Sequence, residues 1–427
     1  MLGLLKREGY EWVRDPAGAE LVIVNTCGFL EVARQESLQA IREIVRLKQQ
    51  GEVRAVIVAG CLAERDKEKL LAQCPGIDQV VGVFGRDEIP LAALRIAGGQ
   101  CGERTILRPA PKAPLPDDHR LRLTLPHLAF LKIAEGCDRL CTFCSIPNMR
   151  GHYASKPVEQ LLGEARQLAA EGVRELILVA QDTSCYGIDL YGRPRLADLL
   201  RGLEEVAGLG WIRLMYVYPM HITDDLIGVL ASSHKILRYM DLPLQHINDR
   251  ILRRMKRQVT RADTERLLGR LRDGIPGLVL RTTMIAGFPG ETEAQFQELV
   301  DFVRQQRFER LGVFAYSREI DTPAARLADH LPPEVAQERR NQLLAVQQEI
   351  AFQWGRSQVG VQMEVLIDRD MPDEPHAFLG RSHADAPEVD GAVYVTGESL
   401  RPGQFVPCEI VAARDYDLIA AAVGPPR

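Results

Sequence analysis

The chain has 427 residues, which is too long for one hydrophobic core and predicts about two to four domains. Hydrophobic residues make up 46% and charged residues 26%, as in ordinary soluble proteins, and we expect neither a transmembrane helix nor a signal peptide. Nine cysteines argue against a disulfide scaffold and favour a reducing cytoplasm, while a net charge of −5 gives no global reason to expect a nucleic-acid partner.

The first segment, residues 1–100, alternates strand and helix patterns. Short apolar runs predict buried parallel strands, and residues 30–50 have one apolar helical face; the expected strands are 21–25, 55–59 and 80–84. This alternation predicts a doubly wound α/β domain, in which ligands bind outside the carboxyl ends of the strands. Cys27 and Cys61 follow the first two strands, so we expect both at one ligand-binding edge.

Residues 101–126 are rich in proline and charge and show little periodicity. They are expected to form a semi-extended linker, with a proline-rich docking peptide as the alternative.

The second segment, residues 127–356, again alternates strands and helices and ends in a polar helix at 333–356. Six strands predict a partial (β/α)6 barrel, whose chemistry would lie at the carboxyl ends of its strands. The expected strands are 128–133, 175–180, 211–217, 239–242, 278–285 and 311–316.

Three cysteines follow the first of these strands with the spacing C-x3-C-x2-C, at Cys137, Cys141 and Cys144. Thiolates hold iron–sulfur clusters, and three of them leave one iron of a [4Fe–4S] cluster open to bind a small molecule. Gly136 lets the backbone turn tightly before the loop, and the aromatic Phe143 precedes the third cysteine. A zinc site is the alternative, but zinc normally takes four ligands and no fourth lies nearby. The loop resembles the signature of radical S-adenosylmethionine (SAM) enzymes.

The third segment, residues 357–424, shows short alternating strands with glycine turns and predicts a small antiparallel β-barrel. Residues 358–427 contain 5 Arg, no Lys and 12 Asp plus Glu, a formal charge of 5 − 12 = −7. Such a surface repels phosphates and favours a basic protein partner; a merely solubilising surface is the alternative.

Together the three segments resemble the methylthiotransferases, a radical SAM family, over nearly the whole chain. The resemblance implies an N-terminal domain with a second [4Fe–4S] cluster, a radical SAM domain and a TRAM β-barrel. It rests on the motifs NTCGF at 25–29, AGCL at 59–62 and RTTMIAGFPGET at 281–292.

The finer resemblance is to the branch that modifies ribosomal protein S12. The motifs that carry it are KIAEGC at 132–137, IPNMRG at 146–151, AQDTSCYG at 180–187, DLPLQHINDRILRRMKR at 241–257, RLGVFAYS at 310–317 and GRSHADAPEVDG at 380–391. It implies addition of a methylthio group to the β-carbon of an aspartate in S12, free or in the small ribosomal subunit, with electrons from a separate donor. The tRNA-modifying branch is the alternative enzyme, although tRNA fits the acidic terminal barrel poorly; a non-enzymatic iron–sulfur protein is the alternative of another class.

The resemblance also implies two clusters, one on Cys137, Cys141 and Cys144 and an auxiliary one on Cys27 and Cys61, together with SAM. The family's first N-terminal cysteine has no counterpart, so we expect a natural reading frame that starts upstream of Met1. Cys74 and Cys101 lie outside the matching motifs and are weak replacements for the missing ligand; Cys185 and Cys408 are interpreted as structural.

Several other residues are candidates, each with an ordinary structural alternative. Gly287 and Gly290 would let the backbone approach the cofactor or form an ordinary strand-to-helix turn. Gln181 and Asp182 would touch cofactor or substrate, or would simply cap a helix. Lys132 would contact the substrate or be a solvated lysine, and His246 would belong to the site or be a hydrogen-bonded core histidine. Arg150 would pair with a carboxylate or form a surface ion pair.

Overall fold

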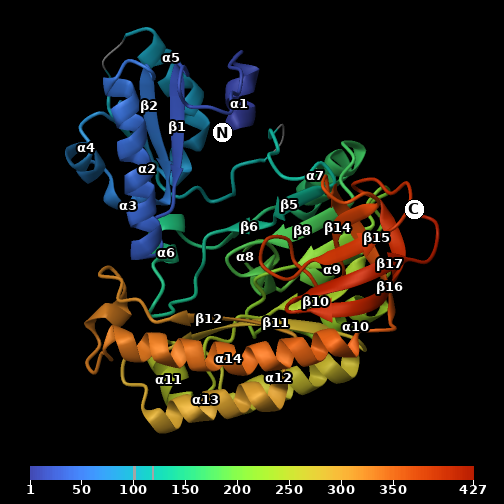
Figure 1. Cartoon of the computed structure of the whole chain (residues 1–427). Coiled ribbons are helices and arrows are strands. Elements are labelled where there is room, and N and C mark those ends of the chain that lie inside the picture. Colours follow the sequence, from blue (N-terminus) through green and yellow to red (C-terminus); the bar gives the residue numbers. More distant parts are fainter. Residues whose placement is uncertain (100–101, 118–119) are drawn as a thin grey trace. The chain divides into compact units, whose positions relative to one another are not determined.

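The structure, a computed structural model, describes residues 1–99, 102–117 and 120–427 (Figure 1). The chain divides into two compact units, each assembled from segments that are distant in sequence. Unit 1 comprises Met1–Leu121, Glu135–Ala154 and Ser317–Arg326, and unit 2 comprises Arg122–Ala134, Ser155–Tyr316 and Leu327–Arg427. Within the described residues, none of the helices has the length and apolar character needed to cross a membrane.

Unit 1 is built on a parallel sheet with the strand order β1-β2-β3-β4. Its elements are α1 (Leu2–Arg7), β1 (Leu21–Thr26), α2 (Glu31–Gln49), β2 (Ala55–Gly60), α3 (Cys61–Asp66), α4 (Lys69–Gln73), β3 (Gln79–Val81), η1 (Val83–Glu88), α5 (Ile89–Ala97), β4 (Thr105–Ile106), α6 (Ile146–Arg150) and η3 (Pro323–Arg326).

Side chains of β2 alternate between two hydrophobic cores. Val56 and Val58 pack with residues of α2 and α3 on one face, whereas Ile57 and Ala59 pack with residues of α5 and α1 on the other. Because β2 is buried on both faces, its sequence is a continuous apolar run. The helices on both faces of the sheet confirm the predicted doubly wound α/β domain. Two details differ, because β3 gives way to the 3-10 turn η1 and because β4 lies within the expected linker.

Unit 2 contains six parallel strands in the order β12-β11-β10-β9-β8-β5, which is their order in the chain. This confirms the partial (β/α)6 barrel. Its elements are β5 (Leu128–Lys132), α7 (Val158–Ala170), β8 (Glu175–Val179), η2 (Thr183–Cys185), α8 (Ile188–Tyr191), α9 (Leu196–Glu204), β9 (Trp211–Leu214), α10 (Asp224–Ser232), β10 (Ile236–Asp241), α11 (Asp249–Arg254), α12 (Arg261–Gly274), β11 (Val279–Ala286), α13 (Glu293–Gln306), β12 (Arg310–Ala315) and α14 (Pro333–Ser357).

Two short strands, β6 (Ala134–Glu135) and β7 (Ala154–Ser155), pair where the chain passes between the units. The long helix α14 runs beside β12 (Figure 1) and buries Leu343 and Ile350, so one stripe of the expected polar helix belongs to the core.

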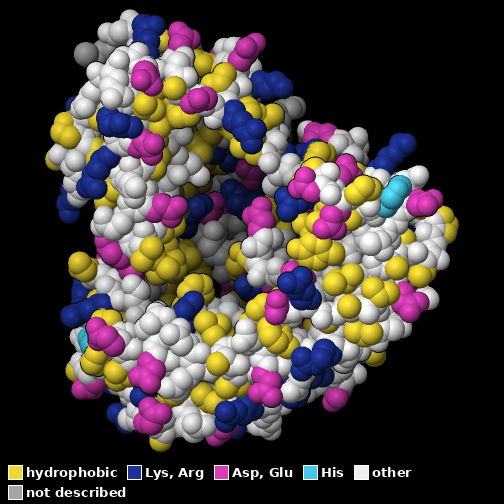
Figure 2. Space-filling model, in the orientation of Figure 1, with side chains coloured by type: hydrophobic (Ala, Val, Ile, Leu, Met, Phe, Trp, Pro, Cys, Tyr) yellow, Lys and Arg dark blue, Asp and Glu magenta, His cyan; other side chains and the backbone are white. Residues whose placement is uncertain are grey.

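The end of the chain forms a closed barrel with the strand order β13-β14-β15-β17-β16, as predicted. Its strands are β13 (Gln362–Asp370), β14 (Ala377–Arg381), β15 (Val393–Thr396), β16 (Phe405–Arg414) and β17 (Asp417–Ala422). Val365, Val395 and Ile410 are among the side chains that fill it, and closure leaves no sheet edge exposed. On the face shown in Figure 2, acidic and basic side chains are interspersed.

Buried ion pairs join this terminal barrel to the strands of unit 2. The carboxylate of Glu175, at the start of β8, accepts from Arg213 at 2.8 Å and from Arg381 of the terminal barrel. Burial opposes ionisation of Glu175, but the two guanidinium groups outweigh it and lower the pKa of the carboxyl. A second buried pair joins Arg310 to Asp385 at 2.6 Å, so the two barrels share charged as well as apolar contacts.

Candidate functional site

The three-cysteine loop lies in unit 1 and has a backbone suited to thiolate ligands. Gly136 has φ +78°, and a Cβ there would come within 2.1 Å of the His152 carbonyl oxygen, so no larger residue fits. The backbone N–H of Arg139 points at Cys137 Sγ at 3.4 Å, and that of Ile146 at Cys144 Sγ at 3.5 Å. Such N–H···S contacts stabilise thiolate charge.

The donor set of this loop fits a cluster better than a single ion. Cys137 and Cys141 are buried and Cys144 is half-buried, and all three are soft sulfur donors. Thiolates of a [4Fe–4S] cluster each bind a different iron and therefore stand further apart than ligands of one ion.

Cys27 and Cys61 lie on adjacent turns at the carboxyl edge of the unit 1 sheet. The last residues of β1 and β2, Thr26 and Gly60, are paired, and a cysteine follows each. A Cβ on Gly28 would come within 2.8 Å of the Cys61 backbone, so glycine permits this close approach of the two turns. Cys27 is exposed and Cys61 is half-buried.

The remaining cysteines of unit 1 do not extend this pair. Cys74 is 3% exposed within the core on the α2 side of the sheet, where burial raises the pKa of its thiol. Cys101 lies outside the described residues.

Arg150 connects the cysteine-bearing segments of unit 1. It ends α6, directly after the three-cysteine loop, and its guanidinium donates to Cys61 Sγ at 3.1 Å and to the Glu135 carboxylate at 3.1 Å. The carboxylate partner matches one sequence expectation. The contact with the Cys61 sulfur could not be predicted from the sequence, because Arg150 and Cys61 are 89 positions apart and belong to different segments.

A segment that sequence reasoning overlooked, residues 317–326, packs in the same unit. Glu319 accepts from the Arg34 guanidinium at 2.5 Å, and Asp321 accepts from Arg65 at 2.8 Å. The second arm of Arg65 donates to the carbonyl of Gly28, beside Cys27, at 3.1 Å. These contacts brace the turn that carries Cys27, but the acidic residues lie some 250 positions or more from their partners, and no local pattern signals them.

In unit 2, Gln181 and Asp182 follow β8, as expected. Asp182 accepts from the backbone N–H of Ser184 at 3.0 Å and from its hydroxyl at 2.6 Å, so it caps η2. For Asp182 the structure thus shows the helix-capping role, which was the structural alternative to contact with cofactor or substrate. Gln181 is half-buried, as are Lys132 at the end of β5 and Phe143 in the three-cysteine loop of unit 1, and a cofactor or substrate role for these three residues stays a prediction.

The AGFPGE turn after β11 is held by a buried polar network around Glu291. Its carboxylate accepts from the Gly287 N–H at 3.1 Å, from Arg339 of α14 at 2.7 Å and from His246 Nε2 at 3.1 Å. The Nδ1 of His246 accepts from the backbone N–H of Asn248 at 3.0 Å, which places the ring proton on Nε2. His246 is thus a hydrogen-bonded core histidine.

Both glycines of this turn have structural reasons for their identity. Gly287 has φ +78° and lies so close to Ala336 that a Cβ would approach it to 2.2 Å. Gly290 has φ +77° and packs against the guanidinium of Arg254. The turn is required by packing, whether or not it also holds a cofactor.

Strained backbone marks the loops after β9 and β10. Tyr216, His221 and Gln245 have φ of +57°, +60° and +73°, which non-glycine residues seldom adopt and which concentrate at ligand sites. The side-chain oxygen of Gln245 is buried with no hydrogen-bond partner among the described residues. These loops lie at the carboxyl ends of the strands, where barrel chemistry is expected. The sequence pointed to the second loop through His246, but nothing in it signalled the strained backbone at Tyr216, His221 and Gln245.

Comparisons with known proteins match all three segments. Family models match the radical SAM superfamily at residues 131–303, the TRAM domain at 359–423 and the uncharacterized protein family UPF0004 at 1–82. A solved structure, the radical SAM methyltransferase TsrM from Kitasatospora setae, shares the fold with a TM-score of 0.55 and 19% identity, over 71% of this chain and 64% of that one.

Curated relatives match from end to end. The ribosomal protein uS12 methylthiotransferase RimO of Lachnoclostridium phytofermentans is 43% identical over 99% of this chain and 96% of its own length. The corresponding protein of Pelotomaculum thermopropionicum is 45% identical over 99% of this chain and 95% of its own length. The chain therefore belongs to the RimO family of radical SAM methylthiotransferases.

Proposed function

We propose that this protein transfers a methylthio group to the β-carbon of an aspartate in ribosomal protein uS12. The observation that carries the proposal is the end-to-end similarity, at 43–45% identity, to two curated enzymes named for that reaction. The acidic terminal segment, with a formal charge of 5 − 12 = −7, agrees with a basic protein substrate rather than with tRNA.

We assign a [4Fe–4S] cluster to Cys137, Cys141 and Cys144 and an auxiliary cluster to Cys27 and Cys61. A cluster with one iron open to SAM supplies, when bound, the radical chemistry that breaks an unactivated C–H bond. The chain itself supplies thiolates, the N–H donors of Arg139 and Ile146, and the Glu291-braced turn, all of which fix geometry before reaction.

The proposal also covers the residues that contact SAM, the division of the chain into domains and the location of the protein in the cell. Phe143, Gln181, Gly287 and Gly290 are proposed to contact SAM. We keep the division into an N-terminal domain (1–100), a linker (101–126), a radical SAM domain (127–356) and a TRAM domain (357–424). A cytoplasmic site follows from the ribosomal substrate, and a separate protein is proposed to deliver electrons.

The direct test is to incubate anaerobically reconstituted, reduced protein and SAM with purified uS12 and, separately, with tRNA. We expect a methylthio mass increase on one aspartate of uS12 and formation of 5′-deoxyadenosine. Cys141→Ser should abolish both products, whereas Cys74→Ala, which alters a core thiol, should retain them. A mass increase on tRNA alone would refute the substrate, and absence of 5′-deoxyadenosine would refute the enzyme class.

A further inference from the structure

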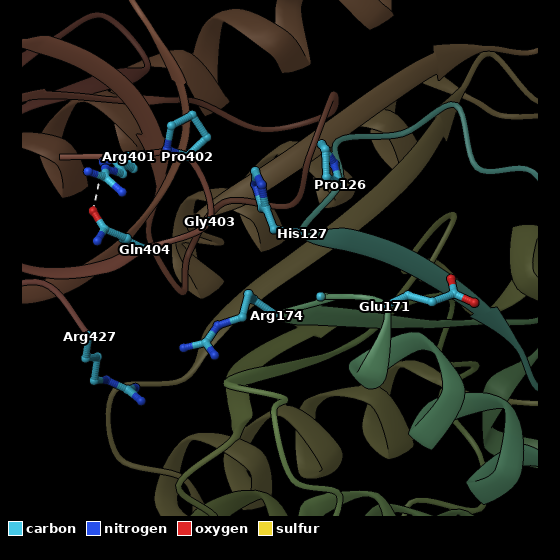
Figure 3. Close-up of a pocket in the computed structure, with 10 residues that line it drawn as sticks. Pro126, His127, Glu171, Arg174, Arg401, Pro402, Gly403, Gln404 and Arg427 are labelled. Carbon is cyan, nitrogen blue, oxygen red and sulfur yellow. Dashed lines mark hydrogen bonds between the residues drawn. The ribbon is translucent and has the colours of Figure 1, made fainter.

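A cavity of about 500 Å³ opens in unit 2 between the terminal barrel and the amino ends of two strands (Figure 3). His127 and Arg174, which directly precede β5 and β8, line one side, and Arg401, Gln404 and Arg427 line the other. Barrel enzymes carry their chemistry at the opposite, carboxyl ends of the strands. The cavity is therefore distinct from the site described above.

Two arginines of this cavity lack a compensating carboxylate. Within the described ranges, neither Arg174 nor Arg401 forms a side-chain ion pair, whereas Arg427 is paired with Glu364 at 2.7 and 2.8 Å. The Nε of Arg174 is also buried with no hydrogen-bond partner in that part of the chain. The acidic residue of the lining, Glu171, points away from the arginines (Figure 3).

Arg174 shares an aromatic contact with the paired Arg427. The guanidinium carbons of Arg174 and Arg427 lie 5.5 and 4.9 Å from the centroid of the same Phe405 ring. Two of the five arginines of residues 358–427 line the cavity, although that segment carries 12 acidic residues. A lining with three arginines and one carboxylate, in which Arg174 and Arg401 form no ion pair among the described residues, favours an anionic ligand.

The chemistry of the lining favours a phosphate of a nucleic-acid backbone. Guanidinium groups match the geometry of phosphate oxygens. The side-chain oxygen of Gln404 accepts from the backbone N–H of Arg401 at 2.8 Å, which leaves the NH2 group of Gln404 as another donor. Among the described residues that line the cavity, the one aromatic ring is that of His127, which is buried and held by Asp368 at 2.8 Å, so the lining offers no open platform for stacking a base. Phosphate contacts of this kind position a partner without reading its sequence.

We propose that this cavity binds an RNA backbone phosphate in the small ribosomal subunit, and that RNA-bound uS12 is the preferred form of the substrate. The inference rests on the proposed function, because it says whether the enzyme prefers uS12 bound to RNA or uS12 alone. A contact far from the reacting carbon would contribute binding energy and orientation for a large substrate. Isolated uS12 has no RNA with which to reach it.

The test compares kcat/KM of the holoenzyme on assembled small subunits and on isolated uS12. The variants are Arg401→Gln, whose side chain is exposed, and the double variant Arg174→Gln with Arg401→Gln; the control is Arg414→Gln, an exposed arginine of the same barrel outside the cavity. We expect the double variant to lose about tenfold or more on assembled subunits, mainly through KM, and to match wild type on isolated uS12. Arg401→Gln should lose less, and the control should lose nothing.

Binding without SAM gives a second readout. The plot of log affinity for small subunits against log salt should become less steep by about 0.7 in the double variant, as expected for one lost single-strand phosphate contact. Equal losses on both substrates, or an unchanged salt slope, would overturn the inference. Absence of modification of either form by the wild-type protein would instead overturn the proposed function.

Discussion

The guanidinium of Arg150 lies 3.1 Å from the sulfur of Cys61 and, through its other arm, 3.1 Å from the carboxylate of Glu135. Arg150 follows the three-cysteine loop, whereas Cys61 belongs to the N-terminal sheet. A charge-assisted donor on a thiolate favours the anion and helps to set the potential of any cluster that the thiolate binds. Arg150 thus links the two cysteine-bearing segments of unit 1 chemically.

We expect Arg150→Gln to lower the reduction potential of the cluster held by Cys61 by tens of millivolts. Reduction adds negative charge, so losing a nearby cation disfavours the reduced state; for a one-electron couple, about 59 mV corresponds to a tenfold change in the equilibrium. An EPR-monitored redox titration measures the shift. Arg150→Lys keeps the charge and should shift it less, and equal potentials in all three proteins would show that the contact is electrostatically silent.

Iron counting tests the assignment of two clusters. Reconstituted wild-type protein should hold about eight irons if both clusters form, and about four if the Cys27 and Cys61 pair is insufficient. In the first case, the double variant Cys27→Ser with Cys61→Ser should fall to about four and still cleave SAM. Cys141→Ser should instead stop SAM cleavage while retaining iron on the auxiliary pair. An iron content unchanged by the double variant would contradict the auxiliary assignment.

Gly287→Ala should destabilise the protein because two penalties coincide. The residue has φ +78°, and the new methyl group would meet Ala336 at 2.2 Å. Left-handed backbone alone costs an L-residue about 1–2 kcal/mol, and the steric overlap adds to it. Gly312→Ala, in β12 with no atom within 4 Å of the added methyl group, is the matched control and should be neutral or stabilising. Apparent unfolding temperatures of the two variants measure the difference, and equal values would contradict it.

The elements that local patterns could predict are those with strong apolar periodicity. The apolar runs now seen as β1, β2, β5, β8 and β11 identified their strands, and the alternating pattern of the last segment identified the closed barrel. The two-residue strand β4 has too little periodicity to detect, so its residues read as linker.

The site was predictable only where it is encoded locally. Cysteine spacing and strand ends placed the candidate ligands, but contacts such as Arg150 to Cys61 and Arg34 to Glu319 arise from the fold, because their partners lie 89 and 285 residues apart. For His246, the sequence allowed a site role and a core role equally. Only the position of Glu291 decides between them.

The ion pairs of the terminal barrel predict a specific acid sensitivity. Burial opposes ionisation of Asp368, but hydrogen bonds from His127 and Arg381 outweigh it and hold the pKa of this carboxyl below its ordinary value. A lowered pKa in the folded state gives stability that is present above the unfolded pKa of about 3.9 and is lost as the pH falls through the folded pKa. We therefore expect the apparent unfolding temperature to fall steeply below about pH 4.

Asp368→Asn isolates this contribution. The variant should be less stable than wild type by about 2 kcal/mol near neutral pH, the scale of hydrogen bonds to a charged group, and the difference should shrink in acid. Thermal unfolding followed by fluorescence between pH 3 and 7 measures it. A stability difference that stays constant over this range would show that the ionisation of Asp368 does not matter.

The fully buried carboxylate of Glu291 and the guanidinium of Arg339, 2.7 Å apart, should be energetically coupled. Glu291→Gln removes a charge that Arg339 needs, because the other carboxylate near Arg339, that of Glu293, is exposed. Leaving a buried cation uncompensated costs about 3 kcal/mol, whereas removing both charges costs much less. The double variant Glu291→Gln with Arg339→Met should therefore be more stable than the sum of the single effects predicts, by about 1 kcal/mol or more.

Glu293→Gln, on the exposed arm of the same arginine, is the matched control and should change stability by less than about 0.5 kcal/mol. Strictly additive single effects in urea unfolding would mean that the Gly287 turn is held by its backbone hydrogen bonds rather than by this ion pair.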